Sequence, residues 1–140
     1  MLLCVTFLTA CSSDTTFLSN DALSSSDDTS GTSSSNAVYQ KIYAEDAYQM
    51  MKNTDEYILL DVRTYEEFIE RRIEGAVLIP DYEIGSRAAA ELPDKDALIL
   101  IYCRSGRRSA NAANELIRMG YTNVYDFGGI IDWPYDTVGG

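Results

Sequence analysis

One thiol and three guanidinium groups lie within the six residues Cys103-Arg104-Ser105-Gly106-Arg107-Arg108. The thiolate is the reactive form of cysteine, and nearby cations stabilise it by lowering the pKa of the thiol. Gly106 allows the backbone to curl so that successive N–H groups converge on one point. A helix beginning just after this run would add the positive end of its dipole. The run therefore has the residue types of a reactive cysteine that receives an anion.

The sequence contains no histidine. This excludes serine–histidine and cysteine–histidine catalysis, together with every metal site that uses imidazole ligands. The acidic residues are scattered along predicted helix faces, which does not fit a paired-carboxylate acid–base site. Activation of the thiol therefore falls to backbone amides and arginines, and no metal or cofactor is expected.

Acidic residues outnumber basic residues by 22 to 11, and the formal net charge is −11. Such a surface repels the phosphates of nucleic acid, which is not an expected partner. The arginine-rich run reverses this charge locally and would attract a small anion. With 140 residues, of which 46% are hydrophobic, the chain has room for one folded domain with a real core.

Apolar runs at 57–62, 76–79 and 97–102 have the pattern of parallel strands buried on both faces. We predict further strands and helices at 39–43, 44–52, 65–71, 82–91, 109–119 and 123–127. Strands that alternate with helices indicate an α/β fold: a mostly parallel central sheet of about five strands, with helices on both faces. Ligands of such sheets bind beyond the carboxyl ends of the strands, which is where Cys103 falls.

Local signals mark where some of these elements begin and end. Thr64 and Glu67 have the spacing of a capping box, so a short helix should begin at Tyr65 with Phe68 turned inward. Pro80 should end the strand at 76–79, because proline lacks the N–H that a strand needs.

Three separated motifs resemble the rhodanese family of sulfurtransferases, and the resemblance covers residues 38–140. They are Leu59-Leu60-Asp61-Val62-Arg63 with Tyr65-Glu66-Glu67-Phe68, Ile73-Glu74-Gly75-Ala76 with Ile79-Pro80, and Cys103 to Ser109. Gly128-Gly129-Ile130 and Asp132-Trp133-Pro134 are similar to the family's closing turn. One departure is Arg72, where the family usually has a histidine of structural importance.

The resemblance implies a three-layer sandwich and a thiosulfate sulfurtransferase-like enzyme. Cys103 would take the outer sulfur of thiosulfate or a persulfide donor, hold it as a persulfide, and pass it to cyanide or a thiol. The substrate-binding loop would cradle the sulfur and steer the donor; it comprises Arg104, Ser105, Gly106, Arg107 and Arg108. Asp61 and Arg63 would support this loop, the alternative being a solvated strand-end carboxylate and an ordinary surface arginine.

Two other classes stay open. Cysteine phosphatases and arsenate reductases wrap an oxyanion with a loop of cysteine, five residues and arginine. Here the sixth residue after Cys103 is Ser109, and Arg108 comes one position early, which favours a single sulfur over a phosphate. The second class is a non-catalytic sulfur carrier or binding module.

Residues 1–11 are apolar, too short to span a bilayer, and end in Leu8-Thr9-Ala10-Cys11, which resembles a bacterial lipobox. This predicts an exported lipoprotein anchored to the outer face of a bacterial membrane through Cys11. The alternative is an apolar terminus that has this tetrapeptide by chance. No Lys or Arg precedes the run, so we expect the true start upstream of Met1.

The Ser-, Thr- and Asp-rich stretch 12–37 is predicted to be a disordered tether, and residues 38–140 the folded domain. Cys4 and Cys11 precede this domain, so it has one thiol and no internal disulfide. The sequence leaves the oligomeric state open, with a monomer as the expectation.

Overall fold

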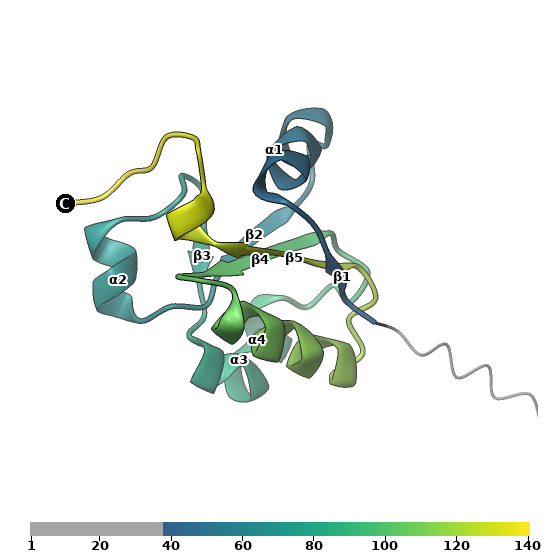
Figure 1. The fold of residues 1–140 in the computed structure, drawn as a ribbon. Coiled ribbons are helices and arrows are strands. Elements are labelled where there is room, and N and C mark those ends of the chain that lie inside the picture. Colours follow the sequence, from purple (N-terminus) through teal and green to yellow (C-terminus); the bar gives the residue numbers. More distant parts are fainter. Residues whose placement is uncertain (1–37) are drawn as a thin grey trace, which may run out of the picture. The chain divides into compact units, whose positions relative to one another are not determined.

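The computed structural model describes residues 38–140. The predicted export signal, the lipidation site at Cys11 and the tether at 12–37 lie outside the described residues. Five parallel strands form one sheet in the order β1-β5-β4-β2-β3 (Figure 1). The predicted α/β fold with a parallel five-stranded sheet is therefore confirmed.

The strands are short, and their bounds are β1 Gln40–Lys41, β2 Ile58–Asp61, β3 Val77–Leu78, β4 Ile99–Cys103 and β5 Val124–Gly129. β4 pairs with β2 on one side and β5 on the other, and all of its residues are buried. A strand in this position contacts apolar layers on both faces, which is why its sequence is continuously apolar. Cys103 is the last residue of β4, so the strand extends one residue past the predicted end.

The strand predicted at 76–79 is not the buried strand that its apolar sequence indicates. Only Val77 and Leu78 pair with a neighbour, and Val77 is 42% exposed. The reason is topological, since β3 lies at the edge of the sheet and has β2 as its one partner. Ile79, just beyond the strand, is fully buried.

The helices are α1 Ala44–Asn53, α2 Tyr65–Glu70, α3 Ile84–Glu91 and α4 Arg107–Arg118, with 3₁₀ turns η1 Asp81–Glu83 and η2 Ile130–Asp132. The helix predicted at 82–91 is thus a 3₁₀ turn followed by an α-helix. α4 begins at Arg107 rather than Ser109, so Arg107 and Arg108 belong to its first turn and not to a free loop. Figure 1 shows α3 and α4 on one face of the sheet and α1 on the other.

Two hydrophobic clusters fill the space between the sheet and its helices. Alternate residues of β4 point to opposite faces, so Ile99, Ile101 and Cys103 belong to the cluster under α3 and α4. Leu100 and Tyr102 belong to the second cluster, with residues of α1 and the C-terminal segment. The Cys103 thiol is therefore on the α4 side of the sheet.

The capping box at the start of α2 is confirmed. Thr64 Oγ1 accepts a hydrogen bond from the Glu67 N–H at 3.4 Å, and Glu67 Oε2 accepts one from the Thr64 N–H at 3.2 Å. Phe68 is half-buried, and the guanidinium of Arg72 lies 5.0 Å from its ring centroid. Among residues 38–140, no helix combines the length and the apolar character needed to cross a membrane.

Candidate active site

Cys103 ends β4 and is 1% exposed. The chain then turns through Arg104 and Ser105 to Gly106, whose φ of 98° lies in the left-handed region that favours glycine. This turn brings the Gly106 N–H back to Sγ of Cys103, to which it donates a hydrogen bond at 3.0 Å. The sulfur therefore sits at the amino end of α4, as the sequence predicts.

The pKa of the Cys103 thiol lies below its ordinary value. Burial raises this pKa, but hydrogen bonds from the Ser109 backbone and hydroxyl and from the amides of Gly106 and Ser105 more than offset that effect. Buried Ser109 also lies within hydrogen-bond distance of two carbonyl oxygens, at 3.1 Å from Gly106 and 3.3 Å from Gly128. Its single hydroxyl hydrogen can therefore go to either carbonyl or to the thiolate.

The three arginines of the run have different partners. Arg108 donates to both carboxylate oxygens of Glu67, at 2.8 Å and 2.9 Å, and so faces α2. Arg104 and Arg107 are exposed, and neither forms an ion pair within residues 38–140. Together with Cys103, Ser105 and Arg108 they line a hollow of about 290 Å³. Two guanidinium groups without an ion-pair partner in the described part of the chain therefore lie at the hollow that contains the thiol.

The end of β5 packs against the turn that follows Cys103. Gly129 pairs with Cys103 across a shift in sheet register, and a Cβ added at Gly129 would lie 2.3 Å from the carbonyl oxygen of Arg104. The Ile131 N–H donates to that same oxygen at 3.3 Å. Position 129 thus requires glycine, because the backbone of the turn lies too close to leave room for a Cβ.

Asp61 and Arg63 form a buried ion pair, with Arg63 Nη2 2.6 Å from Asp61 Oδ2 and side chains 0% and 4% exposed. The alternative that they are solvated surface residues is therefore wrong. Arg63 also donates to the carbonyl oxygen of Arg71, just after α2, at 2.5 Å. None of the described side-chain hydrogen bonds of this pair reaches residues 104–108. The pair contacts the segment around α2 through the Arg71 carbonyl, and it contacts β4 through the Tyr102 ring, whose centroid lies 5.6 Å from the Arg63 guanidinium.

Three contacts were not predicted from the sequence: the ion pair of Glu67 with Arg108, the hydrogen bond of Ser109 to the Cys103 sulfur, and that of Asp126 to the Gly128 N–H. Asp126 is fully buried in β5; its Oδ1 accepts the Gly128 N–H at 3.0 Å, and its Oδ2 has no partner among the described residues. A carboxylate inside the apolar run Val124 to Phe127 was the available signal. Nothing in the sequence indicates that Glu67 pairs with Arg108, because 41 residues separate them.

The described residues hold no cluster of three His, Cys, Asp or Glu side chains that could bind a metal ion. Fold and site together define a single-cysteine α/β domain in which a buried thiol meets the amides of a tight turn. The chain belongs to the rhodanese-like family, whose domain model matches residues 43–134. The resemblance noted in its motifs is thereby confirmed.

Named relatives share this family. The chain is 38% identical over 81 residues to the thiosulfate sulfurtransferase PspE of Escherichia coli, covering 58% of this chain and 78% of the relative. It is 38% identical over 94 residues to a sulfurtransferase of Allochromatium vinosum, covering 66% and 86%. A rhodanese structure with anions from E. coli matches with a TM-score of 0.56 at 37% identity, covering 60% of this chain and 99% of that one. The structure of a rhodanese-related protein from Thermoplasma volcanium matches with a TM-score of 0.62 at 32% identity, covering 71% of this chain and 98% of that one.

Proposed function

We propose that this protein is a sulfurtransferase that moves sulfane sulfur from thiosulfate or a persulfide donor to a thiophilic acceptor through a persulfide on Cys103. The observation that carries the proposal is the Gly106 N–H 3.0 Å from Sγ, at the amino end of α4. Amides in this position stabilise the thiolate before reaction and again when the sulfur departs. The names of the two sulfurtransferase relatives support the same reaction class.

In the first half of the reaction, the Cys103 thiolate attacks the outer sulfur of thiosulfate. A Sγ–S bond forms, the S–S bond of the donor breaks, and its electron pair leaves with sulfite. One thiolate and one thiosulfate dianion thus become one persulfide anion and one sulfite dianion. Arg104 and Arg107, which have no ion-pair partners among the described residues, would attract the dianion to the hollow of about 290 Å³.

In the second half, the acceptor attacks the outer sulfur of the persulfide. With cyanide, a carbon–sulfur bond forms, the Sγ–S bond breaks, and its electron pair returns to Sγ, so thiocyanate and the thiolate are the products. The amides of the turn receive this charge without rearrangement, because they are already directed at Sγ.

The position of Arg108 disfavours the phosphatase and arsenate reductase alternative. A phosphate-binding loop needs its arginine directed at the oxyanion, whereas both Nη atoms of Arg108 donate to Glu67. Only repeated turnover distinguishes an enzyme from a non-catalytic sulfur carrier, since both would hold a persulfide on Cys103.

The test is the intact mass of the purified protein after thiosulfate treatment, followed by a cyanide challenge read out as thiocyanate. We expect a gain of one sulfur atom, lost on addition of cyanide and absent in Cys103→Ser. This variant retains Cys4 and Cys11, so it also controls for reaction at those thiols. A folded, reduced protein that gains no sulfur from thiosulfate or from a persulfide donor would refute the proposal. One sulfur gained without repeated turnover would favour the carrier.

We also propose that the chain is exported and anchored to the outer face of a bacterial membrane through a lipid on Cys11. The support is the Leu8-Thr9-Ala10-Cys11 tetrapeptide after an apolar stretch. Globomycin treatment of cells that express the gene with its native upstream region should accumulate an unprocessed precursor. An unchanged product would rule out lipoprotein processing.

A further inference from the structure

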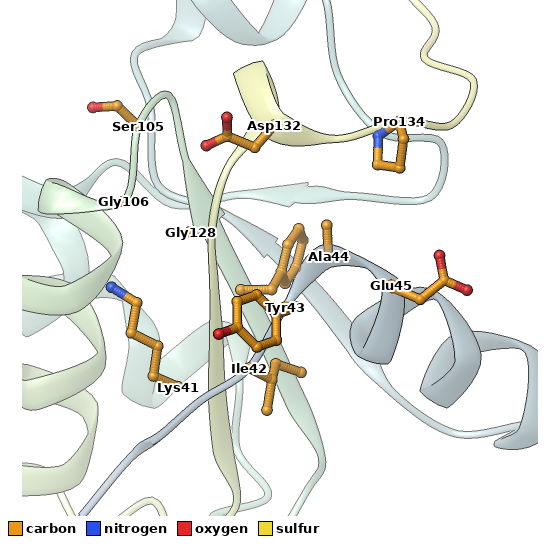
Figure 2. A pocket seen from close by; sticks show the side chains of 11 residues that line it. Lys41, Ile42, Tyr43, Ala44, Glu45, Ser105, Gly106, Gly128, Asp132 and Pro134 are labelled. Atoms are coloured by element: carbon orange, nitrogen blue, oxygen red, sulfur yellow. The ribbon is translucent and has the colours of Figure 1, made fainter.

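A second hollow, of about 630 Å³, lies beside the turn that holds the thiol (Figure 2). One wall comes from β1 and the start of α1, and the opposite wall from Ser105, Gly106 and the end of β5. Ile42, Ala44 and Phe127 give it apolar surface, and Tyr43 stands at its rim with 82% exposure. Its size is that of a small-molecule site rather than of a single ion.

The two hollows share a wall. Ser105 lines both the larger hollow and the smaller one that contains Cys103. Gly106, which also lines the larger hollow, donates its N–H to Sγ of Cys103 at 3.0 Å. A molecule in the larger hollow therefore lies against the same turn that would hold the outer sulfur of a persulfide.

Among the described residues, the larger hollow has one cation and one carboxylate without a side-chain partner. Lys41 and Asp132 are both exposed, and within residues 38–140 neither takes part in an ion pair or a side-chain hydrogen bond. Figure 2 shows the Lys41 ammonium and the Asp132 carboxylate on the side of Ser105 and Gly106. The third charged residue, Glu45, lies at the far end and already accepts hydrogen bonds from Tyr135 and Gln49.

We infer that this hollow binds the sulfur acceptor, and that the acceptor is a zwitterionic low-molecular-mass thiol, such as cysteine or a short cysteine-containing peptide. Lys41 receives its carboxylate, Asp132 receives its ammonium, and the apolar surface contacts its carbon chain. Two opposite charges in one site select a molecule with both charges over a simple anion or cation. This inference rests on the proposed function and names the substrate of its second half.

The transfer of sulfur from Cys103 to the acceptor conserves atoms and charge. The acceptor thiol gives its proton to the Cys103 persulfide anion, and the acceptor thiolate that results attacks the outer sulfur of the protonated persulfide. A new S–S bond forms while the bond from the outer sulfur to Sγ breaks, and the electron pair of the broken bond stays on Sγ. The products are a hydropersulfide of the acceptor and the Cys103 thiolate, with one negative charge before and after.

The experiment compares acceptors at saturating thiosulfate in steady-state kinetics. The probes are cysteine and glutathione, which are zwitterionic, 2-mercaptoethanol, which is uncharged, and cyanide. Lys41→Met and Asp132→Asn should each raise the KM for the zwitterionic thiols about tenfold, with kcat within about twofold, as loss of one ionic contact predicts. The KM values for 2-mercaptoethanol and cyanide should not change.

Lys52→Met is the matched control, since this lysine is also near α1 but contacts the Tyr48 ring and lines a different hollow. Its kinetics should equal those of the parent with every acceptor. Unchanged KM values for cysteine and glutathione in the Lys41 and Asp132 variants would overturn the inference, as would an equal rise for 2-mercaptoethanol. In both cases, persisting cyanide turnover would leave the proposed function intact. If the parent protein showed no turnover with any acceptor, both the acceptor inference and the proposed function would be overturned.

Discussion

The carboxylate of Glu67 accepts two hydrogen bonds from the guanidinium of Arg108, at 2.8 Å and 2.9 Å, and so joins α2 to the first turn of α4. Both side chains are mostly buried, with 26% and 22% of their surfaces exposed. Arg108 lines the hollow that contains Cys103, but both of its Nη atoms are directed at Glu67. It also links the segment stabilised by Asp61 and Arg63 to the turn that holds the thiol.

Glu67→Gln should make the protein less stable by about 1 kcal/mol at pH 7, as expected for a partly exposed ion pair. The variant keeps an oxygen that can cap the Thr64 N–H. The hydrogen bonds from Arg108 lower the pKa of the Glu67 carboxyl from 4.5 to about 2. A lowered carboxyl pKa contributes stability above its ordinary value, and that stability is lost as the pH falls through the folded-state pKa.

The difference in unfolding free energy between the parent and Glu67→Gln should therefore shrink as the pH falls from 4.5 towards 2. Urea unfolding at several pH values measures it. Glu66→Gln is the control, because Glu66 is exposed on the same helix and forms no ion pair within the described chain. A difference that stays constant with pH would show that the ion pair is not its source.

Ser109→Ala should raise the pKa of the Cys103 thiol and slow its reaction at neutral pH about tenfold, the equivalent of one lost hydrogen bond. The Ser109 hydroxyl is among the groups that lower this pKa. The pH profile of iodoacetamide alkylation measures the change. Ser105→Ala should leave the thiol pKa where it is, since Ser105 acts through its backbone amide. Equal profiles for Ser109→Ala and the parent would contradict the assignment.

Gly129→Ala should displace the turn, because the new Cβ would lie 2.3 Å from the Arg104 carbonyl oxygen and 2.6 Å from the Ser105 Cα. We expect a loss of about 2 kcal/mol in stability and at least about a tenfold slower persulfide formation. Chemical unfolding and stopped-flow mixing with thiosulfate measure these effects.

Gly85→Ala in α3 is the matched control, since its new Cβ would meet only a flexible Glu115 oxygen at 3.7 Å. It should gain up to about 1 kcal/mol, because alanine has the higher helix propensity. Parent-like persulfide formation in Gly129→Ala would show that the turn adapts without cost.

Asp61→Asn should lower the free energy of unfolding by about 3 to 5 kcal/mol, because it leaves the guanidinium of Arg63 buried without its counter-charge. The double variant Asp61→Leu/Arg63→Met should recover at least half of this loss, since well-packed apolar residues replace a buried ion pair at little cost. Urea unfolding of both variants measures the recovery. A double variant no more stable than Asp61→Asn would show that the pair has a further role.

The pattern of residues was sufficient for the fold and for the place of the thiol. Three apolar runs indicated parallel strands, because strands covered on both faces need continuous apolar sequence, and their alternation with helical periodicity indicated the α/β fold. The same rule placed Cys103 at the carboxyl end of a central strand. The exception was the run at 76–79, where apolar residues form an edge strand with Val77 exposed, since strand order is a property of the whole sheet.

The partners of charged groups were decided by the tertiary structure. The sequence by itself determined that Cys103 is followed by a tight turn and a helix, because those are local properties of glycine, of helix caps and of apolar periodicity. It could not pair Arg108 with Glu67, which is distant in the chain, or predict that Arg104 and Arg107 have no ion-pair partner within residues 38–140. Such contacts form only when α2, α4 and the end of β5 come together, since long side chains pair with whatever charge the fold brings within reach.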